Sequence, residues 1–394
     1  MNETDQTKPC PCGSGLGFTF CCGVPGRIAL NAEVKIRLSD DGSIAAGTPT
    51  PQIQKALDTL ESNPDLFPAR IRFIENKAWF VKMSPDWYRE SVFLDPERIK
   101  GTYVVETSLP WLQVVCDRIP WQPTAFIFHT AFCGSTLMAQ ALEALFHCLP
   151  LREPEALGNI QYYLSNPAIL PEIKQAWFGR VMRLLSRRYH PQQGVVIKAN
   201  DFSNPLMCDL LRWDPSVPML FMYTPLNQFV AGCVKAEIRR EWIQGRYKTV
   251  KAKAPALLKM ADMPEPEATS YGEMAAIYWS YNIALLQQAM GFESAQLRSL
   301  DFNRMLDHPL AAVQACGELL GLQPLSGVDA QAEIDKLFGT YSKNSNFKYS
   351  PEQRAKDIER ALTEHKAHID RAEVIAHQLL GDAYPEQGLP GSLI

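Results

Sequence analysis

The chain carries four cysteines close together near its start. One residue separates Cys10 from Cys12, and after eight further residues Cys21 and Cys22 follow as an adjacent pair. Four thiolates can complete a tetrahedral zinc site, and a segment too small to bury a core needs such a link in order to fold. Two adjacent disulfides or unliganded thiols are the alternatives. We therefore predict a small zinc-binding module over residues 1–23.

A second stretch with possible chemistry is a loop between an apolar strand and a helix. Residues 125–128 predict a buried strand, and residues 137–146 predict a helix. Gly134, Ser135 and Thr136 lie between them. Backbone N–H groups at a helix start hold phosphate well, and glycine lets the backbone approach a ligand closely. The loop is not a Walker A loop, because no lysine stands in the turn, and an ordinary helix cap is the alternative.

The elements that position this loop follow an alternating pattern. After the strand at 125–128, apolar strands are predicted at 195–197 and 219–222, and long helical stretches lie between them. Strands that alternate with helices predict crossover connections and a parallel sheet. We therefore predict an α/β fold over residues 121–394, with a parallel sheet flanked by helices. Residues 24–120 predict an accessory, poorly defined α+β region without a recognisable chemical motif.

The later part of the chain predicts mostly helices, most clearly over residues 301–322 and 351–380. Cations gather over residues 235–253, where only Glu237 and Glu241 are acidic. A solvated helix explains this stretch as well as an anion-binding face does.

Composition restricts the classes of function. The net charge is −4, which argues against a protein that coats nucleic acid or an anionic membrane. No apolar stretch reaches the roughly 20 residues that a membrane span needs, and the first residues lack the pattern of a secretory signal. We therefore expect a cytoplasmic protein whose scattered cysteines are buried free thiols. These cysteines are Cys116, Cys133, Cys148, Cys208, Cys233 and Cys316.

The cysteine spacing and the surrounding Pro-Cys-Gly-Ser-Gly closely resemble the SEC-C motif, known from the C-terminal tail of the preprotein translocase ATPase. The resemblance covers residues 9–23. It implies one structural zinc ion and a role in contacts with a protein partner. Residues 16–20 read Leu-Gly-Phe-Thr-Phe where that family often has lysine and tyrosine, which points to a loss of partner-binding charge.

The stretch at 126–138 resembles the 5′-phosphosulfate-binding loop of sulfotransferases, especially of bacterial members that read Phe-His-x-Ala-Phe-x-x-Ser-Thr-Leu. Residues 195–200 resemble the strand that ends in Lys-Thr-His, and residues 222–235 resemble the 3′-phosphate-binding strand and helix. Residues 297–322 are similar to a late segment of the same family. The resemblance implies a P-loop NTPase-like sulfotransferase fold and 3′-phosphoadenosine 5′-phosphosulfate (PAPS) as co-substrate.

The resemblance also implies a donor site around the loop. The residues expected to bind PAPS are Phe132, Cys133, Gly134, Ser135, Thr136, Leu137, Tyr223, Lys235, Arg239 and Lys343. Phe132 stands where the family's loop often carries a catalytic lysine, and Tyr223 stands where its 3′-phosphate strand carries an arginine. Other cations are therefore expected to hold the 3′-phosphate. The alternative is that these residues merely belong to a surface helix or a polar loop. They are Lys235, Arg239, Arg240, Lys343 and Lys348.

A small set of residues are candidates for the chemical step. Lys198 matches the lysine of Lys-Thr-His and is expected to face the sulfuryl oxygens, whereas Asn200 replaces the family's histidine base. We expect Glu153 to be the base, because it follows the loop helix near the predicted carboxyl edge of the sheet. Glu155 and His129 are the alternatives. A surface lysine and an ordinary helix acid are the other interpretations of Lys198 and Glu153.

The function predicted from these observations is sulfuryl transfer from PAPS to a hydroxyl or amine of an unidentified acceptor, either a small molecule or a protein. The alternatives are a P-loop small-molecule kinase, which the missing Walker lysine disfavours, and a catalytically inactive protein that keeps the fold for binding. We expect a protein partner at the zinc module, and neither a membrane nor a specific nucleic acid as partner.

Overall fold

The computed structural model describes residues 58–394, except 62, 252, 259–268, 294–295, 342–343, 349–350 and 387, together with two short strands. These are β1 (Arg37–Leu38) and β2 (Ile44–Ala45). At residues 102–105, 340–341, 344–348 and 351–355 only the backbone is described. The four cysteines of the predicted zinc module and Lys343 lie outside the described residues, so these predictions stay predictions.

The chain divides into two compact units. Unit 1 comprises Met1–Thr124 and Leu151–Val195, and unit 2 comprises Ala125–Pro150 and Val196–Ile394. Residues 151–195 thus group with the N-terminal part of the chain. The predicted domains at 1–23, 24–120 and 121–394 stay predictions.

A five-stranded parallel sheet carries the predicted α/β architecture, in the order β10-β9-β6-β8-β7. Its strands are β6 (Thr124–His129), β7 (Cys148–Arg152), β8 (Gly194–Lys198), β9 (Met219–Tyr223) and β10 (Leu297–Asp301). Every residue of β6, β7 and β9 is buried, as expected for strands covered on both faces. Strand β9 pairs in parallel with β6 and with β10. The strands predicted at 125–128, 195–197 and 219–222 are confirmed.

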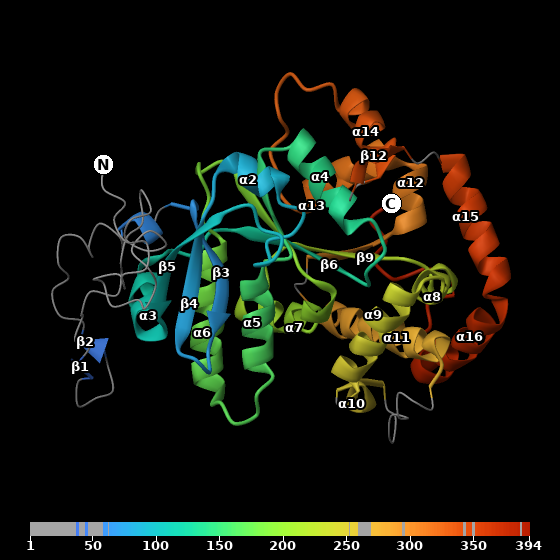
Figure 1. Ribbon diagram of the computed structural model, residues 1–394, viewed down its shortest axis with the longest axis horizontal. Coiled ribbons are helices and arrows are strands. Elements are labelled where there is room, and N and C mark those ends of the chain that lie inside the picture. The colour runs from blue at the N-terminus through green and yellow to red at the C-terminus, as the bar shows by residue number, and fades with distance from the viewer. Residues whose placement is uncertain are drawn as a thin grey trace, which may run out of the picture. The chain divides into compact units, whose positions relative to one another are not determined.

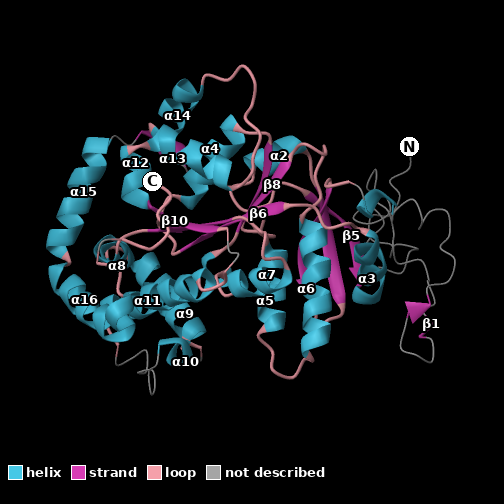
Figure 2. Ribbon diagram, turned by 180° about the vertical axis from the view of Figure 1, so that it is seen from behind, coloured by secondary structure: helices cyan, strands magenta, loops and turns pink. Residues whose placement is uncertain are grey.

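Helices of unit 2 lie on both faces of its part of the sheet. Figures 1 and 2 show α4, α13 and α14 on one face, and α8 and α11 on the other. The helices of unit 2 are α4 (Ser135–Leu145), α7 (Leu206–Trp213), α8 (Leu226–Val234), α9 (Glu237–Val250), α10 (Ala254–Leu258), α11 (Tyr271–Met290), α12 (Phe302–Asp307), α13 (Pro309–Leu319), α14 (Ala330–Phe338), α15 (Pro351–Glu364) and α16 (Lys366–Leu380). Apolar residues of α4, α13 and α14 form one buried cluster with β6 and β9.

Both long helices predicted in the later part of the chain are interrupted. The segment 301–322 forms α12 and α13, which are separated at His308 because Pro309 fits the first turn of a helix and not its interior. The segment 351–380 forms α15 and α16, which are separated at His365. Strands β11 (Thr340–Tyr341) and β12 (Asn344–Lys348) precede α15 as an antiparallel pair.

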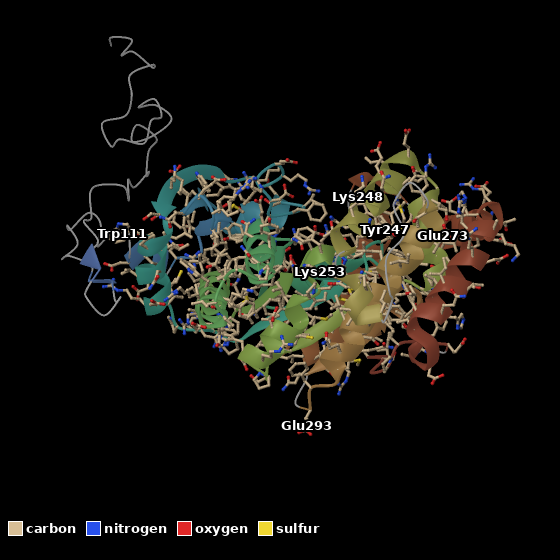
Figure 3. All side chains as sticks on the ribbon, turned by 90° about the horizontal axis from the view of Figure 1, so that it is seen from below. Trp111, Tyr247, Lys248, Lys253, Glu273 and Glu293 are labelled. Atoms are coloured by element: carbon tan, nitrogen blue, oxygen red, sulfur yellow. The ribbon has the colours of Figure 1, made fainter. Side chains whose placement is uncertain are left out.

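A capping box starts α11. The Ser270 hydroxyl accepts a hydrogen bond from the Glu273 N–H (3.3 Å), and the Glu273 carboxylate accepts one from the Ser270 N–H (2.7 Å). Glu273, which is labelled in Figure 3, also pairs with Arg371 of α16 at 2.8 Å according to the positions of their side-chain atoms. Burial alone would raise the pKa of Glu273, but the hydrogen bonds from Ser270 and the charge of Arg371 hold it below its usual value.

The last residues extend the sheet beyond β10. The Ser299 N–H donates to the Gly391 carbonyl, and the Leu393 N–H donates to the Ser299 carbonyl, both at 2.9 Å. At the end of β9, the Tyr223 hydroxyl accepts a hydrogen bond from the Leu389 N–H (3.1 Å). Tyr223 therefore anchors this tail.

Unit 1 contains an antiparallel sheet in the order β3-β4-β5 together with several helices. These elements are β3 (Leu66–Arg72), β4 (Lys77–Lys82), β5 (Thr102–Ser108), α2 (Pro85–Glu90), α3 (Leu109–Arg118), α5 (Glu155–Leu164) and α6 (Pro171–Leu185).

Two buried arginines bind backbone carbonyls in unit 1. Arg187 donates to the carbonyls of Leu60, Asn63, Leu66 and Leu184 at 2.6–3.0 Å. Burial lowers the pKa of Arg187 to about 10, so the side chain stays charged at neutral pH. Arg152 donates to three carbonyls at the C-terminal end of α2, where the helix dipole favours a cation.

The six scattered cysteines are buried and free, as predicted. Within the residues that the structure describes, no helix is long and apolar enough to cross a membrane.

Candidate anion-binding site

The loop between β6 and α4 has an unusual backbone. Ala131, Phe132 and Gly134 adopt positive φ angles of 72°, 54° and 71°. Such angles are uncommon for residues other than glycine and cost roughly 1–2 kcal/mol each, so the surrounding structure must hold them in place. Turns of this kind direct successive N–H groups into a concavity that suits an anion.

Gly134 is required at the junction with α4. It is the N-cap residue and offers no side-chain cap, so the predicted alternative of an N-cap by Ser135 or Thr136 is wrong. An added Cβ would lie 2.5 Å from the Phe302 ring and 2.8 Å from the Met305 methyl group. The first N–H groups of α4 therefore meet a glycine instead of a capping oxygen, and an anion could bind there.

His129 braces the loop from the end of β6. Its Nδ1 accepts a hydrogen bond from the Ala131 N–H (3.0 Å), and its Nε2 lies 2.9 Å from the Ala199 carbonyl oxygen. A backbone N–H can only donate, so Nδ1 carries the lone pair and the ring proton lies on Nε2, directed at Ala199. Both ring nitrogens are engaged, and a role as base would require one of these bonds to break.

Two polar residues fix the loop from neighbouring segments. Asn204 brackets the backbone of His129, donating to its carbonyl at 2.9 Å and accepting from its N–H at 3.4 Å. Thr224, which directly follows β9, donates to the Phe132 carbonyl at 3.2 Å. Its own N–H donates to the Thr130 hydroxyl at 3.4 Å. The strained backbone is therefore held from both sides.

Lys198 lies next to His129, the residue that precedes the loop. It is the last residue of β8, is 1% exposed, and its Nζ lies 3.2 Å from Nε2 of His129. Burial raises the pKa of the Cys133 thiol to about 11, while the charge of Lys198 and hydrogen bonds from Ser135 act in the opposite direction. The thiol thus stays protonated at neutral pH.

Phe132 belongs to a group of aromatic rings beside the loop. Its ring centroid lies 4.9 Å from that of Trp242 and 6.0 Å from that of Phe229. The Arg239 guanidinium lies 4.4 Å from the Phe132 ring and donates to the Gly232 carbonyl at 3.1 Å. Phe132 and Arg239, both predicted to bind PAPS, are therefore in contact.

A partly buried ion pair lies next to these rings. Arg246 donates twice to the Asp201 carboxylate, at 2.6 and 2.9 Å, and the Tyr278 hydroxyl donates to the same carboxylate at 2.6 Å. Burial and then the charge of Asp201 raise the pKa of Tyr278 well above its usual value. Trp242 packs against both Arg246 and Tyr278. This cluster positions Trp242 against the loop.

Helix α9 presents its cations on more than one side. Tyr247 is fully buried and the next residue, Lys248, is exposed (Figure 3). Arg240 donates to the Val234 carbonyl at 2.8 Å. Lys235, just after α8, is exposed, although partial burial of its amine and then the charge of Arg239 lower its pKa. The cation-rich stretch thus combines structural contacts with a solvated face.

Several predicted donor-site residues have other contacts. The side chains of Cys133 and Leu137 belong to the buried core cluster, so only their backbone groups are open to a loop ligand. Tyr223 binds the C-terminal tail. The side chain of Lys348 is not described. Ser135 and Thr136, predicted in the loop before a helix at 137–146, form the first two residues of α4, and both are buried.

The predicted bases Glu153 and Glu155 belong to unit 1. Glu153 follows β7 with a φ of 53°. Glu155 accepts two hydrogen bonds from Arg70, at 2.7 and 3.2 Å. The role of Glu153 at the loop stays a prediction.

Sequence reasoning missed the polar residues that follow the strands. Thr224 follows β9, while Asp201 and Asn204 follow β8, at the carboxyl ends where ligands of parallel sheets bind. Their position directly after apolar runs is a signal that the sequence contains.

No family model and no curated protein matches the chain. Among solved structures, it is similar to the sulfotransferase from Alicyclobacillus acidocaldarius, with 14% sequence identity over 65% of this chain and 96% of that chain. The TM-score is 0.34.

Proposed function

We propose that the chain transfers a sulfuryl group from PAPS to a hydroxyl or amine of an acceptor. The observation that carries this proposal is the strained loop at residues 130–134, whose backbone forms hydrogen bonds with His129 and Thr224 and which leads directly into α4. A rigid cradle of N–H groups at a helix N-terminus suits the 5′-phosphosulfate of the donor.

The reaction balances without a redox partner. The acceptor oxygen or nitrogen attacks sulfur, the bond from sulfur to the bridging phosphate oxygen breaks, and 3′,5′-ADP leaves with the electron pair. The acceptor loses its proton to a base. Charge is spread over the sulfuryl and bridging oxygens, so positioned donors and cations provide most of the catalysis.

The residues of this chain divide these roles. Loop N–H groups bind the 5′-phosphate and the leaving oxygen, and Lys198 supplies positive charge from beneath the loop. Arg239, held against Phe132, adds a second cation at the side of the loop where the family's lysine is replaced. Glu153 is the proposed base. The same cradle would also suit a nucleoside phosphate, which is why the kinase and the inactive binding protein are tested directly.

The N-terminal cysteines extend the proposal. Cys10, Cys12, Cys21 and Cys22 would bind one structural zinc ion, and the module would recruit a protein partner without taking part in the transfer. We also propose a cytoplasmic location.

The deciding experiment is calorimetric titration of the full chain with 3′,5′-ADP, and separately with ATP in the presence of magnesium. We expect micromolar binding of 3′,5′-ADP in preference to ATP. Lys198→Met, which keeps the buried volume but removes the charge, should weaken binding by at least about tenfold. Lys336→Met, which removes an exposed lysine of α14, is the matched control and should bind as the wild type does.

Each other outcome decides between the alternatives. A preference for ATP would favour the kinase and refute the proposal, and binding of neither nucleotide would refute both. Tight binding of 3′,5′-ADP without release of 3′,5′-ADP from PAPS, across a panel of phenols, alcohols and amines, would favour the inactive binding protein.

A further inference from the structure

Unit 1 contains a cavity that the proposed transfer does not use. It lies between the turn that joins β3 to β4 and the C-terminal half of α5 with the loop after it. Its volume is about 900 Å³. The lining residues are Ile71, Arg72, Phe73, Ile74, Glu75, Asn159, Tyr162, Tyr163, Ser165, Asn166, Pro167 and Ile169.

Exposed apolar side chains gather at this cavity. In the described part of unit 1, the large hydrophobic residues that are exposed fall in the lining segments or within the next few residues of the chain. They are Ile74 (87%), Tyr162 (72%), Leu170 (56%) and Ile173 (42%). Turns usually carry small polar residues, so an isoleucine at the tip of this one needs a reason. Single exposed hydrophobic residues are ordinary, but a group of them around a cavity marks a binding site.

The aromatic part of the cavity is already formed. The Phe73 ring stacks on that of Tyr163 with centroids 4.0 Å apart, and it meets the edge of Trp177 at 5.5 Å. Asn159 accepts a hydrogen bond from the Ile71 N–H at 2.8 Å and so fixes the hairpin against α5. A ligand would not have to order these side chains, which favours binding.

The polar side chains of the lining are directed at the protein itself. Ser165 donates to the Gln161 carbonyl at 2.9 Å, and Asn166 accepts from the Ala168 N–H at 3.0 Å. Arg72 and Glu75 carry opposite charges 4.0 Å apart. The site therefore offers stacking and apolar contact with no excess of charge, which suits a neutral ligand with few polar groups.

We propose that this cavity binds a neutral, mostly apolar small molecule that contains a flat ring. The volume lies within the range of roughly 300–1,000 Å³ that is typical of small-molecule sites. The twelve lining residues are fewer than the roughly 20–30 that each side of a stable protein interface contributes. The site is independent of the anion-binding loop, and its test does not rest on the proposed transfer.

The probe for the test is Nile red, a neutral and apolar fluorophore, titrated into the full chain. We expect saturable, blue-shifted emission from one site. Ile74→Glu places a carboxylate at the mouth, where the ligand would desolvate it, and should weaken binding by at least about tenfold. Ile238→Glu changes another exposed isoleucine, 75% exposed on α9 of unit 2, and should leave binding unchanged.

The remaining outcomes overturn the proposal. They are absence of saturable binding to the wild type, or equal loss of binding in the two variants. Both substituted side chains are exposed, so thermal unfolding should show folded variants in each case. Sedimentation is the further check, because a wild-type dimer that Ile74→Glu converts to a monomer would identify the patch as a contact between copies of the chain.

Discussion

Replacing His129 by asparagine or by glutamine separates its two hydrogen bonds. An asparagine amide occupies the place of Nδ1 and can accept from the Ala131 N–H, whereas a glutamine amide occupies the place of Nε2 and reaches toward the Ala199 carbonyl. His129→Asn therefore keeps the contact with the loop, and His129→Gln keeps only the contact with the neighbouring strand. The pair tests whether His129 positions the loop.

The expected magnitude follows from the lost partners. In His129→Gln, the Ala131 N–H stays buried without its acceptor, which costs about 1–3 kcal/mol. Ala131 has a strained φ of 72°. Without the hydrogen bond, we expect the loop to relax to another conformation, in which its N–H groups no longer point into one concavity. We expect the affinity for 3′,5′-ADP to fall by at least about tenfold, since tenfold corresponds to roughly 1.4 kcal/mol. In His129→Asn, the loss should stay within about threefold.

The assay combines calorimetry with hydrogen exchange of the peptide that contains the loop. The Ala131 amide should exchange slowly in the wild type and in His129→Asn, and quickly in His129→Gln. Equal affinities in the two variants, with equal protection of the loop, would refute the positioning role. The exchange measurement remains informative even if the wild type does not bind 3′,5′-ADP.

Three further predictions concern stability and thiol chemistry. Gly134→Ala should lower the free energy of unfolding in urea by about 2–5 kcal/mol, because of the positive φ and the contact with Phe302. Gly245→Ala, which has open space around it in α9, should raise the same free energy by about 0.5–1 kcal/mol. Equal effects of the two substitutions would contradict this account. The folded-state pKa of Glu273 is lowered, so the stability that its carboxylate contributes is present above pH 4.5, its usual pKa, and is lost as the pH falls through the folded-state pKa. The difference in the free energy of unfolding between wild type and Glu273→Gln, measured with denaturant, should therefore shrink on acidification. A difference that does not change with pH would refute this prediction. Burial raises the pKa of Cys116 to about 12 and that of Cys133 to about 11, so the six described cysteines should not react with Ellman's reagent in the native protein. Removal of zinc by a chelator should expose up to four thiols of the N-terminal module to the same reagent. Fast reaction of those four thiols before chelation would exclude a zinc site.

The parallel sheet and the loop at its edge could be predicted because local sequence determines both. The strands are continuous apolar runs, and the sequence Gly134-Ser135-Thr136 lies directly between a strand and a helix. The interruption before Pro309 was not predicted, although proline in an apparent helix interior is a signal for a new first turn. No pattern of comparable strength marks the interruption at His365.

The supporting contacts could not be predicted, because they join residues that are distant in the chain. Asp201 and Arg246 are 45 positions apart, and Tyr223 and Leu389 are 166 apart. The sequence indicated that Tyr223 follows a buried strand, but not that the C-terminal tail returns to it. The role of His129 in holding the loop depends on the positive φ of Ala131, and the residue type of an alanine does not predict such an angle.

The division of the chain has a consequence for its synthesis. Unit 1 needs the stretch up to Val195 to be complete, and the strand, loop and helix at 125–150 are made before that stretch exists. Domains usually fold in the order in which they leave the ribosome. Here the apolar strand β6 and helix α4 leave the ribosome before β9 and β10, the strands of the same core, have been synthesised. This chain order leaves an apolar segment without its partners until the later strands have been made, and an expression boundary near residue 121 would separate the two parts of unit 1.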